Sequence, residues 1–185
     1  MKNTYLTSHF PLLSIIMFSL SFAIYTENYV IDLLDKLGIY AGLIEFFTER
    51  GIKITLLFVL LLFFFMVFSA LKLIADTIVQ ISLLFFSKDV EGKDLNKIRA
   101  GSWIYLCSAV IALLLSKYIE LIVMTFLVAT SVYFIYFLYK LNDSLSGFRI
   151  VGIVMFHLLF WSSFCLAIFY TLTRLYNGII ASLPL

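Results

Sequence analysis

The sequence predicts an all-α fold, namely a polytopic membrane helix bundle with about five transmembrane helices and an amphipathic interfacial segment. The first observation is composition: 63% of the 185 residues are hydrophobic and 13% are charged, whereas soluble domains carry about 25% charged residues. A soluble protein of this length would lack the polar side chains needed to cover its surface. The second observation is that the apolar residues form separate runs, several of which approach the length of a membrane-crossing helix.

We expect a single transmembrane helical domain over residues 1–185, because no Gly/Ser/Pro-rich or low-complexity linker divides the chain. The sequence shows no internal repeat of a useful period, which disfavours an inverted-repeat transporter. The net charge of +2 gives no basis for a nucleic-acid-binding surface. The expected partners are therefore the lipid bilayer and, within it, another membrane protein or a second copy of the chain.

The first predicted span covers residues 10–25, where Pro11 suits the first turn of a helix. The same residues also fit a cleaved secretory signal, because Lys2 gives a sparse basic start and Ala23 closes a passable cleavage site. We expect the helix to be retained, since the rest of the chain is clearly multi-spanning. The cleaved form remains the alternative.

An amphipathic interfacial segment is predicted over residues 27–51. Apolar residues recur at helical spacing on one side and charged residues lie on the other: Val30, Leu33, Leu34 and Leu37 face away from Asp32, Asp35 and Lys36. The segment carries too much charge to cross a bilayer. It is typical of one or two short helices that lie at the membrane surface.

Four further spans are predicted over residues 52–76 with a helical extension to 86, 102–116, 121–139 and 150–172. A tight connection at residues 117–120 separates the third span from the fourth. One continuous helix over residues 102–139 would measure about 57 Å at 1.5 Å per residue. That length is far too great for one crossing, so the sequence favours a short helical hairpin.

Loop charges predict the orientation, because Lys and Arg favour the cytoplasmic side of a membrane. Basic residues gather in and beside two loops and at the N-terminus: Lys2, Lys88, Lys93, Lys97, Arg99, Lys140 and Arg149. The opposite side carries more acidic than basic residues. The prediction is a multi-pass protein of the cell membrane with a cytoplasmic N-terminus and a C-terminus outside.

The most unusual polar residues lie within "SALKLIADTIVQ", residues 69–80, where Ser69, Lys72, Asp76 and Gln80 interrupt a long apolar run. On a helix these four residues fall within an arc of about 80°. One interpretation is a buried stripe that lines a cavity or relays protons, although a charge near the bilayer centre costs about 2.5–3.5 kcal/mol. This stripe is the first candidate site.

The second interpretation of this stripe is structural. A helix over residues 54–86 would measure about 50 Å, longer than the roughly 30 Å hydrocarbon core. If it enters the core near Ile54, Lys72 can extend to the cytoplasmic head groups. Asp76 and Gln80 would then lie at or beyond the membrane surface.

His157 is the other polar candidate, since it lies inside the fifth predicted span. A histidine at that depth forms either a buried structural hydrogen bond or part of a proton relay. The two cysteines, Cys107 and Cys165, lie in apolar runs, and the chain has no CxxC motif or Cys/His cluster. We therefore expect no metal and no cofactor.

Small residues four apart predict where membrane helices approach one another closely. Such pairs occur in the last three spans, at Ser108, Ala112 and Ser116, at Thr125 and Ala129, and at Ser163 and Ala167. We expect these residues to pack the bundle, with a contact between copies of the chain as the alternative.

The absence of Walker, GxSxG, HExxH and GxGxxG motifs disfavours a classical enzyme. The first hypothesis is a non-enzymatic membrane protein, namely an accessory or assembly subunit whose helices pack on a partner. The alternative is a small transporter or channel that uses Lys72, Asp76 and Gln80. An intramembrane enzyme has the least support, because it would need a second acidic or basic residue close to Asp76.

Three stretches carry a resemblance to a known family: "MKNTYLTSHFPLL", residues 1–13, "SALKLIADTIVQISLLFFSKDVEGKDL", residues 69–95, and "GSWIYL", residues 101–106. They resemble an uncharacterised YufK-like family of small multi-pass membrane proteins from bacilli. The resemblance implies a location in a bacterial cytoplasmic membrane. It brings no known activity and no functional residues to this chain.

Overall fold

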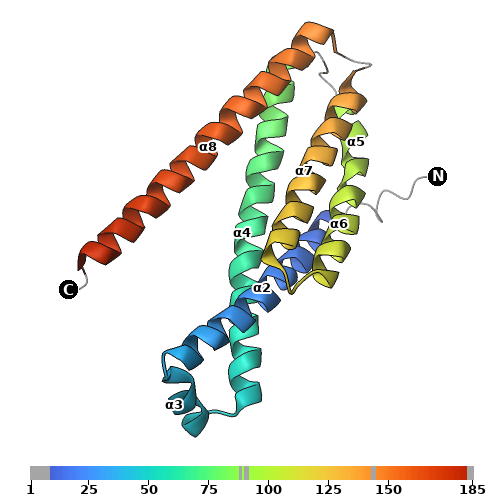
Figure 1. Ribbon diagram of the computed structural model, residues 1–185. Coiled ribbons are helices and arrows are strands. Elements are labelled where there is room, and N and C mark those ends of the chain that lie inside the picture. The colour runs from blue at the N-terminus through green and yellow to red at the C-terminus, as the bar shows by residue number, and fades with distance from the viewer. Residues whose placement is uncertain (1–8, 88, 90–91, 143–144, 183–185) are drawn as a thin grey trace.

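The computed structural model describes residues 9–87, 89, 92–142 and 145–182. All regular elements of this part are helices (Figure 1): α2 (Phe10–Lys36), α3 (Ile39–Phe46), α4 (Glu49–Phe86), α5 (Lys93–Ile98), the 3₁₀ helix η1 (Arg99–Gly101), α6 (Ser102–Leu114), α7 (Ile119–Leu141) and α8 (Gly147–Ser182). Within the described residues, five segments are long and apolar enough to cross a membrane, namely α2, α4, Asp94–Leu114, α7 and α8. The predicted all-α membrane bundle is confirmed.

The predicted interfacial segment divides at Gly38, whose φ of 71° ends α2 in a conformation that glycine adopts without strain. Residues 27–36 continue α2, and residues 39–46 form α3, in which no residue is buried. Thr48 then begins α4, because its hydroxyl accepts a hydrogen bond of 3.1 Å from the Gly51 amide. The helix that follows runs without a break to Phe86, which includes the expected extension.

One core cluster lies where α2 crosses α4, α6 and α7. The Phe18 ring lies 5.9 Å from the Phe68 ring of α4 and 5.4 Å from the Phe126 ring of α7, centroid to centroid. Ala109 and Ala112 of α6 are fully buried against it, so small side chains let the helices approach closely. The buried serines of α2 donate to carbonyl oxygens of their own helix: Ser14, Ser19 and Ser21.

The second core cluster defines what we call the closed end of the bundle, where α4 ends at Phe86, α7 ends at Leu141 and α8 begins at Gly147. Its buried residues are Ile98, Phe137, Leu141, Leu145 and Ile153. Gly152 allows α8 to touch α4 here, since a Cβ atom at that position would lie 2.4 Å from the Phe86 ring.

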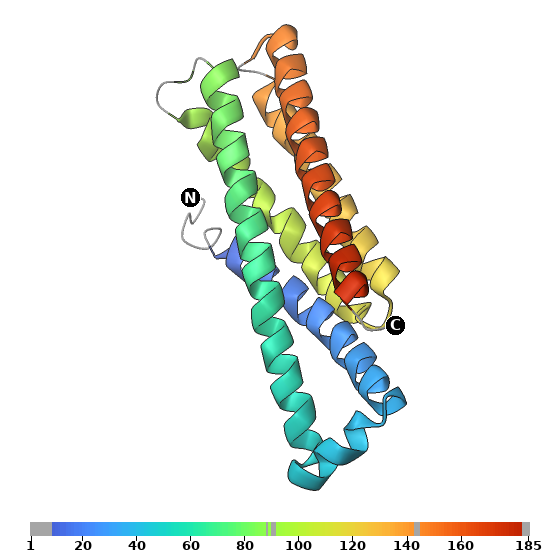
Figure 2. The same cartoon turned by 90° about the vertical axis from the view of Figure 1, so that its left-hand side faces the viewer.

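The opposite end, which we call the open end, contains α3 and residues 158–182 of α8. Figure 1 shows α8 leaving α4 as it runs toward its C-terminus, and every residue from 165 to 182 is exposed. The last turns of α2, α3 and the first turns of α4 form an arm that projects beyond the connection between α6 and α7 (Figures 1 and 2). The two helices α4 and α8 are therefore close together at the closed end and apart toward the open end.

Some residues used in the predictions lie outside the described part of the chain. They are Lys2, on which the signal-peptide alternative depends, and Lys88, which contributes to the predicted orientation. The side chain of Lys93 is likewise not described. The remaining basic residues of that prediction, Lys97, Arg99, Lys140 and Arg149, all lie at or near the closed end.

Candidate functional site

The polar stripe of α4, defined as Ser69, Lys72, Asp76 and Gln80, lies at the surface of the described bundle. Lys72 forms an ion pair with Asp76 one turn further along the helix. The two side chains are 39% and 50% exposed. The side chains of Ser69 and Gln80 make no hydrogen bond to any described residue. The stripe therefore contains a half-exposed ion pair and two polar side chains, Ser69 and Gln80, without a hydrogen-bond partner among the described residues.

The position of the stripe follows from the side of α4 that packs at the closed end. Phe86, Leu83 and Val79 contact the core cluster that includes Ile153 of α8. Steps of three and four residues continue that same side of the helix as Asp76, Lys72 and Ser69. The stripe therefore continues the packed face of α4 into the region where α8 diverges from α4.

Hydroxyl groups from two other helices lie near the stripe. The Asp76 carboxylate lies within electrostatic range of Tyr105 in α6 and Tyr133 in α7, although no hydrogen bond joins it to either tyrosine among the described residues. The Tyr105 hydroxyl donates to Thr130 Oγ1 at 3.3 Å, and the two tyrosine rings are 5.4 Å apart. Asp76 is thus level with residues inside the spans formed by α6 and α7. It does not lie at the end of the bundle.

Sequence reasoning missed these hydroxyls, although a signal was present. Tyrosines favour the two membrane surfaces, whereas Tyr105 and Tyr133 lie several residues inside predicted spans. Aromatic residues with a hydroxyl at such depth favour a polar neighbour, and the structure supplies Thr130 to Tyr105.

His157 occupies a different place, between α7 and α8 in the closed-end core, where it is 6% exposed. Its ring lies 5.3 Å from Phe134, 5.6 Å from Phe137 and 6.0 Å from Phe156. Nδ1 is 2.9 Å from the Ile153 carbonyl oxygen, which only accepts, so Nδ1 carries the proton. Nε2 is then a buried acceptor that has no partner among the described residues.

The two predicted polar candidates do not form one site. Among the described residues, no hydrogen bond, ion pair or ring contact joins His157 to Asp76. The histidine belongs to the aromatic packing of the closed end, and the stripe belongs to the open surface of α4. A proton relay through both groups has no contact to support it in the described part of the chain.

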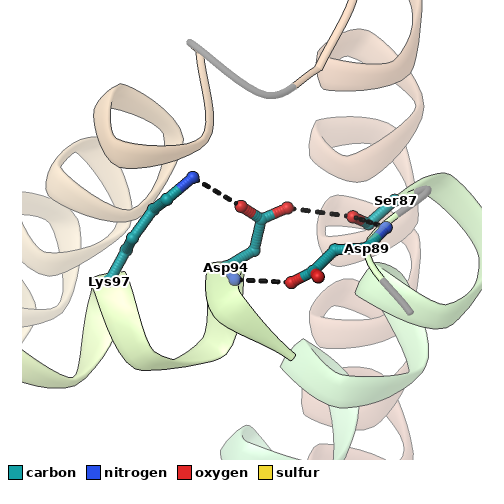
Figure 3. A network of polar contacts seen from close by, with 4 residues as sticks. All are labelled: Ser87, Asp89, Asp94 and Lys97. Carbon is teal, nitrogen blue, oxygen red and sulfur yellow. Dashed lines mark hydrogen bonds and ion pairs between the residues drawn. The ribbon is translucent and has the colours of Figure 1, made fainter. Parts of the chain in front are cut away.

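A polar network that the sequence did not predict closes the turn between α4 and α5 (Figure 3). Asp94, which is 3% exposed, accepts from Ser87 Oγ at 2.9 Å and from Lys97 Nζ at 2.9 Å. Its amide donates to Asp89 Oδ2 at 2.6 Å, and the Asp89 amide donates to Ser87 Oγ at 3.0 Å. These bonds hold the end of α4 against the start of α5, so the role of the network is to stabilise the turn between the two helices.

The described residues bring together no group of three or more His, Cys, Asp or Glu side chains that would hold a metal ion. Cys107 and Cys165 are exposed and do not form a disulfide. The chemistry available near the stripe is therefore that of one ion pair, an amide and several hydroxyls.

Within the described residues, five helices long and apolar enough to cross a membrane, one of which carries a polar stripe, define an all-helical, multi-pass membrane protein. The chain belongs to a family of unknown function, DUF5366, whose model matches residues 27–184. It is 44% identical over 184 residues to the uncharacterised membrane protein YufK of Bacillus subtilis (strain 168), with all of both chains covered. No solved structure matches it. The resemblance that the sequence suggested is confirmed.

Proposed function

We propose that the chain is a non-enzymatic accessory or assembly protein of the bacterial cell membrane, which binds a partner membrane protein through the polar stripe of α4. The observation that supports this proposal is the half-exposed ion pair of Lys72 and Asp76, level with hydroxyls of α6 and α7. A pair that faces lipid at this depth remains poorly solvated. A helix of another protein would supply the missing hydrogen bonds.

The energetic argument rests on what surrounds the stripe. A charged side chain at the bilayer centre costs about 2.5–3.5 kcal/mol on insertion scales. Hydrogen bonds between membrane helices contribute about 0.6–2 kcal/mol each. Ser69 and Gln80 have no described hydrogen-bond partner, so both are free to bond across a new helix contact. A partner helix along α4 would therefore gain several such bonds at once.

A non-enzymatic role is supported by the state of Asp76. The carboxylate is ion-paired with Lys72, whereas acid–base catalysis by carboxylates commonly uses two acids held in different environments. None of the ion pairs or hydrogen bonds of the described residues brings a second acid to Asp76.

The orientation is part of the proposal. The closed end carries Lys97, Arg99, Lys140 and Arg149, and the arm at the open end carries more acidic than basic residues. We therefore place the N-terminus in the cytoplasm and the C-terminus outside. A membrane-impermeant thiol reagent, applied to intact cells, should label a single cysteine at residue 181 and leave one at residue 96 unlabelled. The reverse pattern would contradict this orientation.

A small transporter or channel is the second candidate, because the hydroxyls of Tyr105, Thr130 and Tyr133 lie near the ion pair. This function predicts that cysteines at residues 76 and 80 react with a water-soluble thiol reagent. It also predicts an ion flux into proteoliposomes that disappears in Asp76→Asn. Protection of both cysteines, with no flux above empty liposomes, would exclude it.

The accessory role is tested with a photo-reactive residue at Leu73, which is 69% exposed and next to the stripe. Illumination of cell membranes should give one adduct of discrete mass, and Asp76→Asn should reduce its yield. The same residue at Ile135 of α7, which is 66% exposed, serves as the matched lipid-facing control. Adducts to lipid alone at both positions would contradict the proposed function.

A further inference from the structure

The polar stripe of α4 ends in a cavity at the closed end. This cavity has a volume of about 480 Å³ and lies between the last turns of α4 and the start of α5. Gln80, the last residue of the stripe, lines it beside leucines of both helices, and the other polar residues of its wall are Ser87, Asp89 and Asp94. The stripe thus meets, in this cavity, the polar network drawn in Figure 3.

The stripe also covers most of the thickness of the hydrocarbon core. The level of the core follows from α7, whose 23 residues, about 34 Å, end at Leu141 in the closed-end cluster beside Phe86 of α4. Counted from Phe86 at 1.5 Å per residue, Asp76 lies about 15 Å and Ser69 about 26 Å along the helix. Polar groups therefore follow α4 from the closed-end surface through most of the roughly 30 Å core.

The stripe is accessible from the side. Gly152 and Phe156 of α8 contact Phe86 of α4, and beyond them α8 diverges from α4 (Figure 1). Both side chains of the Lys72–Asp76 ion pair are half-exposed. In a chain without a bound partner, the molecules that reach an exposed side chain at this depth are lipids. The occupant that the membrane itself supplies is therefore a phospholipid.

The charges of the stripe match those of a phospholipid head group. The phosphodiester is an anion that accepts hydrogen bonds, and the Lys72 ammonium only donates them. Asp76, about 6 Å further along the helix, accepts from an ammonium or hydroxyl group that the head group carries beyond its phosphate. The Gln80 amide can donate and accept, so it suits either part of the head group at the cavity.

The spacing and exposure of these residues suit a path more than a closed binding site. Ser69, Lys72, Asp76 and Gln80 follow one another at steps of three or four residues, which places one polar group on each helical turn. A half-exposed ion pair is weakly held, so Lys72 and Asp76 can exchange their mutual contact for contacts with a head group. Hydrocarbon alone offers a charged head group no such partner at any depth.

We propose that the stripe is a path along which phospholipid head groups cross between the two leaflets, while their acyl chains remain in the lipid beside α4. The head group enters at the cavity, binds Lys72 and Asp76 midway, and leaves beyond Ser69. The movement is passive and runs in both directions, and no covalent bond changes. This path goes beyond the proposed function: a partner helix on the stripe closes it, so it belongs to the chain without its partner.

The path is tested with the purified full-length chain in liposomes of phosphatidylglycerol and phosphatidylethanolamine. A trace of phosphatidylethanolamine carries a fluorophore that dithionite, added outside, destroys only in the outer leaflet. Exchange between leaflets makes the remaining fluorescence decay as well. Lys72→Met with Asp76→Leu should slow this decay roughly tenfold or more, because the head group loses its charge-assisted hydrogen bonds.

The matched control is Glu49→Leu with Lys53→Met, which removes the ion pair at the start of the same helix, outside the stripe. Both double variants leave the net charge unchanged, and the control should exchange lipid at the rate of the natural chain. Lys72→Arg keeps the cation and should retain exchange. Each variant is first checked for a single monodisperse peak in detergent. A loss in Lys72→Arg as large as in the double variant would overturn the role of the charge.

The outcomes separate the lipid path from the proposed function. Exchange no faster than in protein-free liposomes, or equally fast in the two double variants, would overturn the path. Bleaching of a soluble dye trapped in the vesicles would also overturn it, because dithionite would then enter through a water-filled pore. If the Leu73 position still gives its protein adduct in cell membranes, the proposed function stands without the path. Exchange that depends on Lys72 and Asp76, with no protein adduct at Leu73, would support the path and reject the partner.

Discussion

The closed end and the open end are built from the same kind of apolar helix, yet α8 packs against α4 only at the closed end. Lipid tails are as apolar as leucine, so apolar helices gain no hydrophobic free energy by associating in a membrane. The closed end adds a glycine contact between Gly152 and Phe86 and a network around Asp94. Between the two ends, the stripe of α4 presents a half-exposed ion pair that α8 does not cover. Specific contacts, not hydropathy, therefore decide where this bundle is compact.

The largest effect on the difference between the two ends is expected from the substitution Gly152→Leu. A Cβ atom there meets the Phe86 ring at 2.4 Å, so α8 must move from α4 and the closed end should lose about 3 kcal/mol of stability. Thermal unfolding in detergent would show a clearly lower midpoint. Gly178→Leu is the matched control at the open end, because nothing lies within 4 Å of its Cβ position. Equal effects of the two substitutions would contradict the difference between the ends.

A smaller effect is expected from Asp94→Ala at the closed end. The substitution removes the buried carboxylate that accepts from Ser87 and Lys97, and should cost about 1–3 kcal/mol. Denaturant or heat titration of the purified protein measures the loss. Glu49→Ala removes an exposed ion pair with Lys53 at the open end and should leave the midpoint unchanged. A large effect of Glu49→Ala would show that the arm is more ordered than its exposure indicates.

The ion pair of the stripe should respond differently to single and double substitution. Lys72→Met leaves Asp76 charged without its partner, whereas Lys72→Met with Asp76→Leu removes both charges. We expect the single variant to be severalfold less abundant in membranes, equivalent to about 1 kcal/mol. The double variant should recover abundance but lose the adduct at Leu73. Quantitative immunoblotting of membranes reports the first effect, and photo-crosslinking the second.

The smallest effect is expected from His157→Phe. The replacement fits an aromatic cluster and removes Nε2, the buried acceptor that has no described partner. Stability should therefore change by less than about 1 kcal/mol in either direction, as for other volume-conserving core substitutions. Thermal unfolding provides the measurement. A large loss of stability would reveal a hydrogen bond to Nε2 that the described residues do not supply.

The sequence predicts the helical class, the membrane location and the polar residues of α4, because these depend on composition and on periodicity within one helix. It does not predict where α8 leaves α4. Small-residue pairs looked alike in the last three spans, yet Ala112 and Ala129 are buried while Ser163 and Ala167 are exposed. That difference depends on contacts between residues far apart in the chain, such as Gly152 with Phe86, which single-helix patterns do not encode.

The sequence does not predict the polar neighbours of the stripe, because these too depend on contacts between residues far apart in the chain. Tyr105 and Tyr133 reach the region of Asp76 only through the pairing of α6 with α7. The network around Asp94 likewise requires the turn after Phe86 to fold back onto α5. The sequence indicates that these residues are polar or aromatic, and the fold decides which of them meet.

The length of α4 has a consequence for the membrane itself. Its 38 residues correspond to about 57 Å, and residues 54–86 alone correspond to about 50 Å, more than the roughly 30 Å hydrocarbon core. Such hydrophobic mismatch makes the surrounding bilayer thicken or the helix tilt, at a modest cost for each ångström. Neighbouring molecules that share one thickened patch divide that cost between them. The bilayer itself therefore favours gathering these long helices together, and it favours regions where the membrane is already thick.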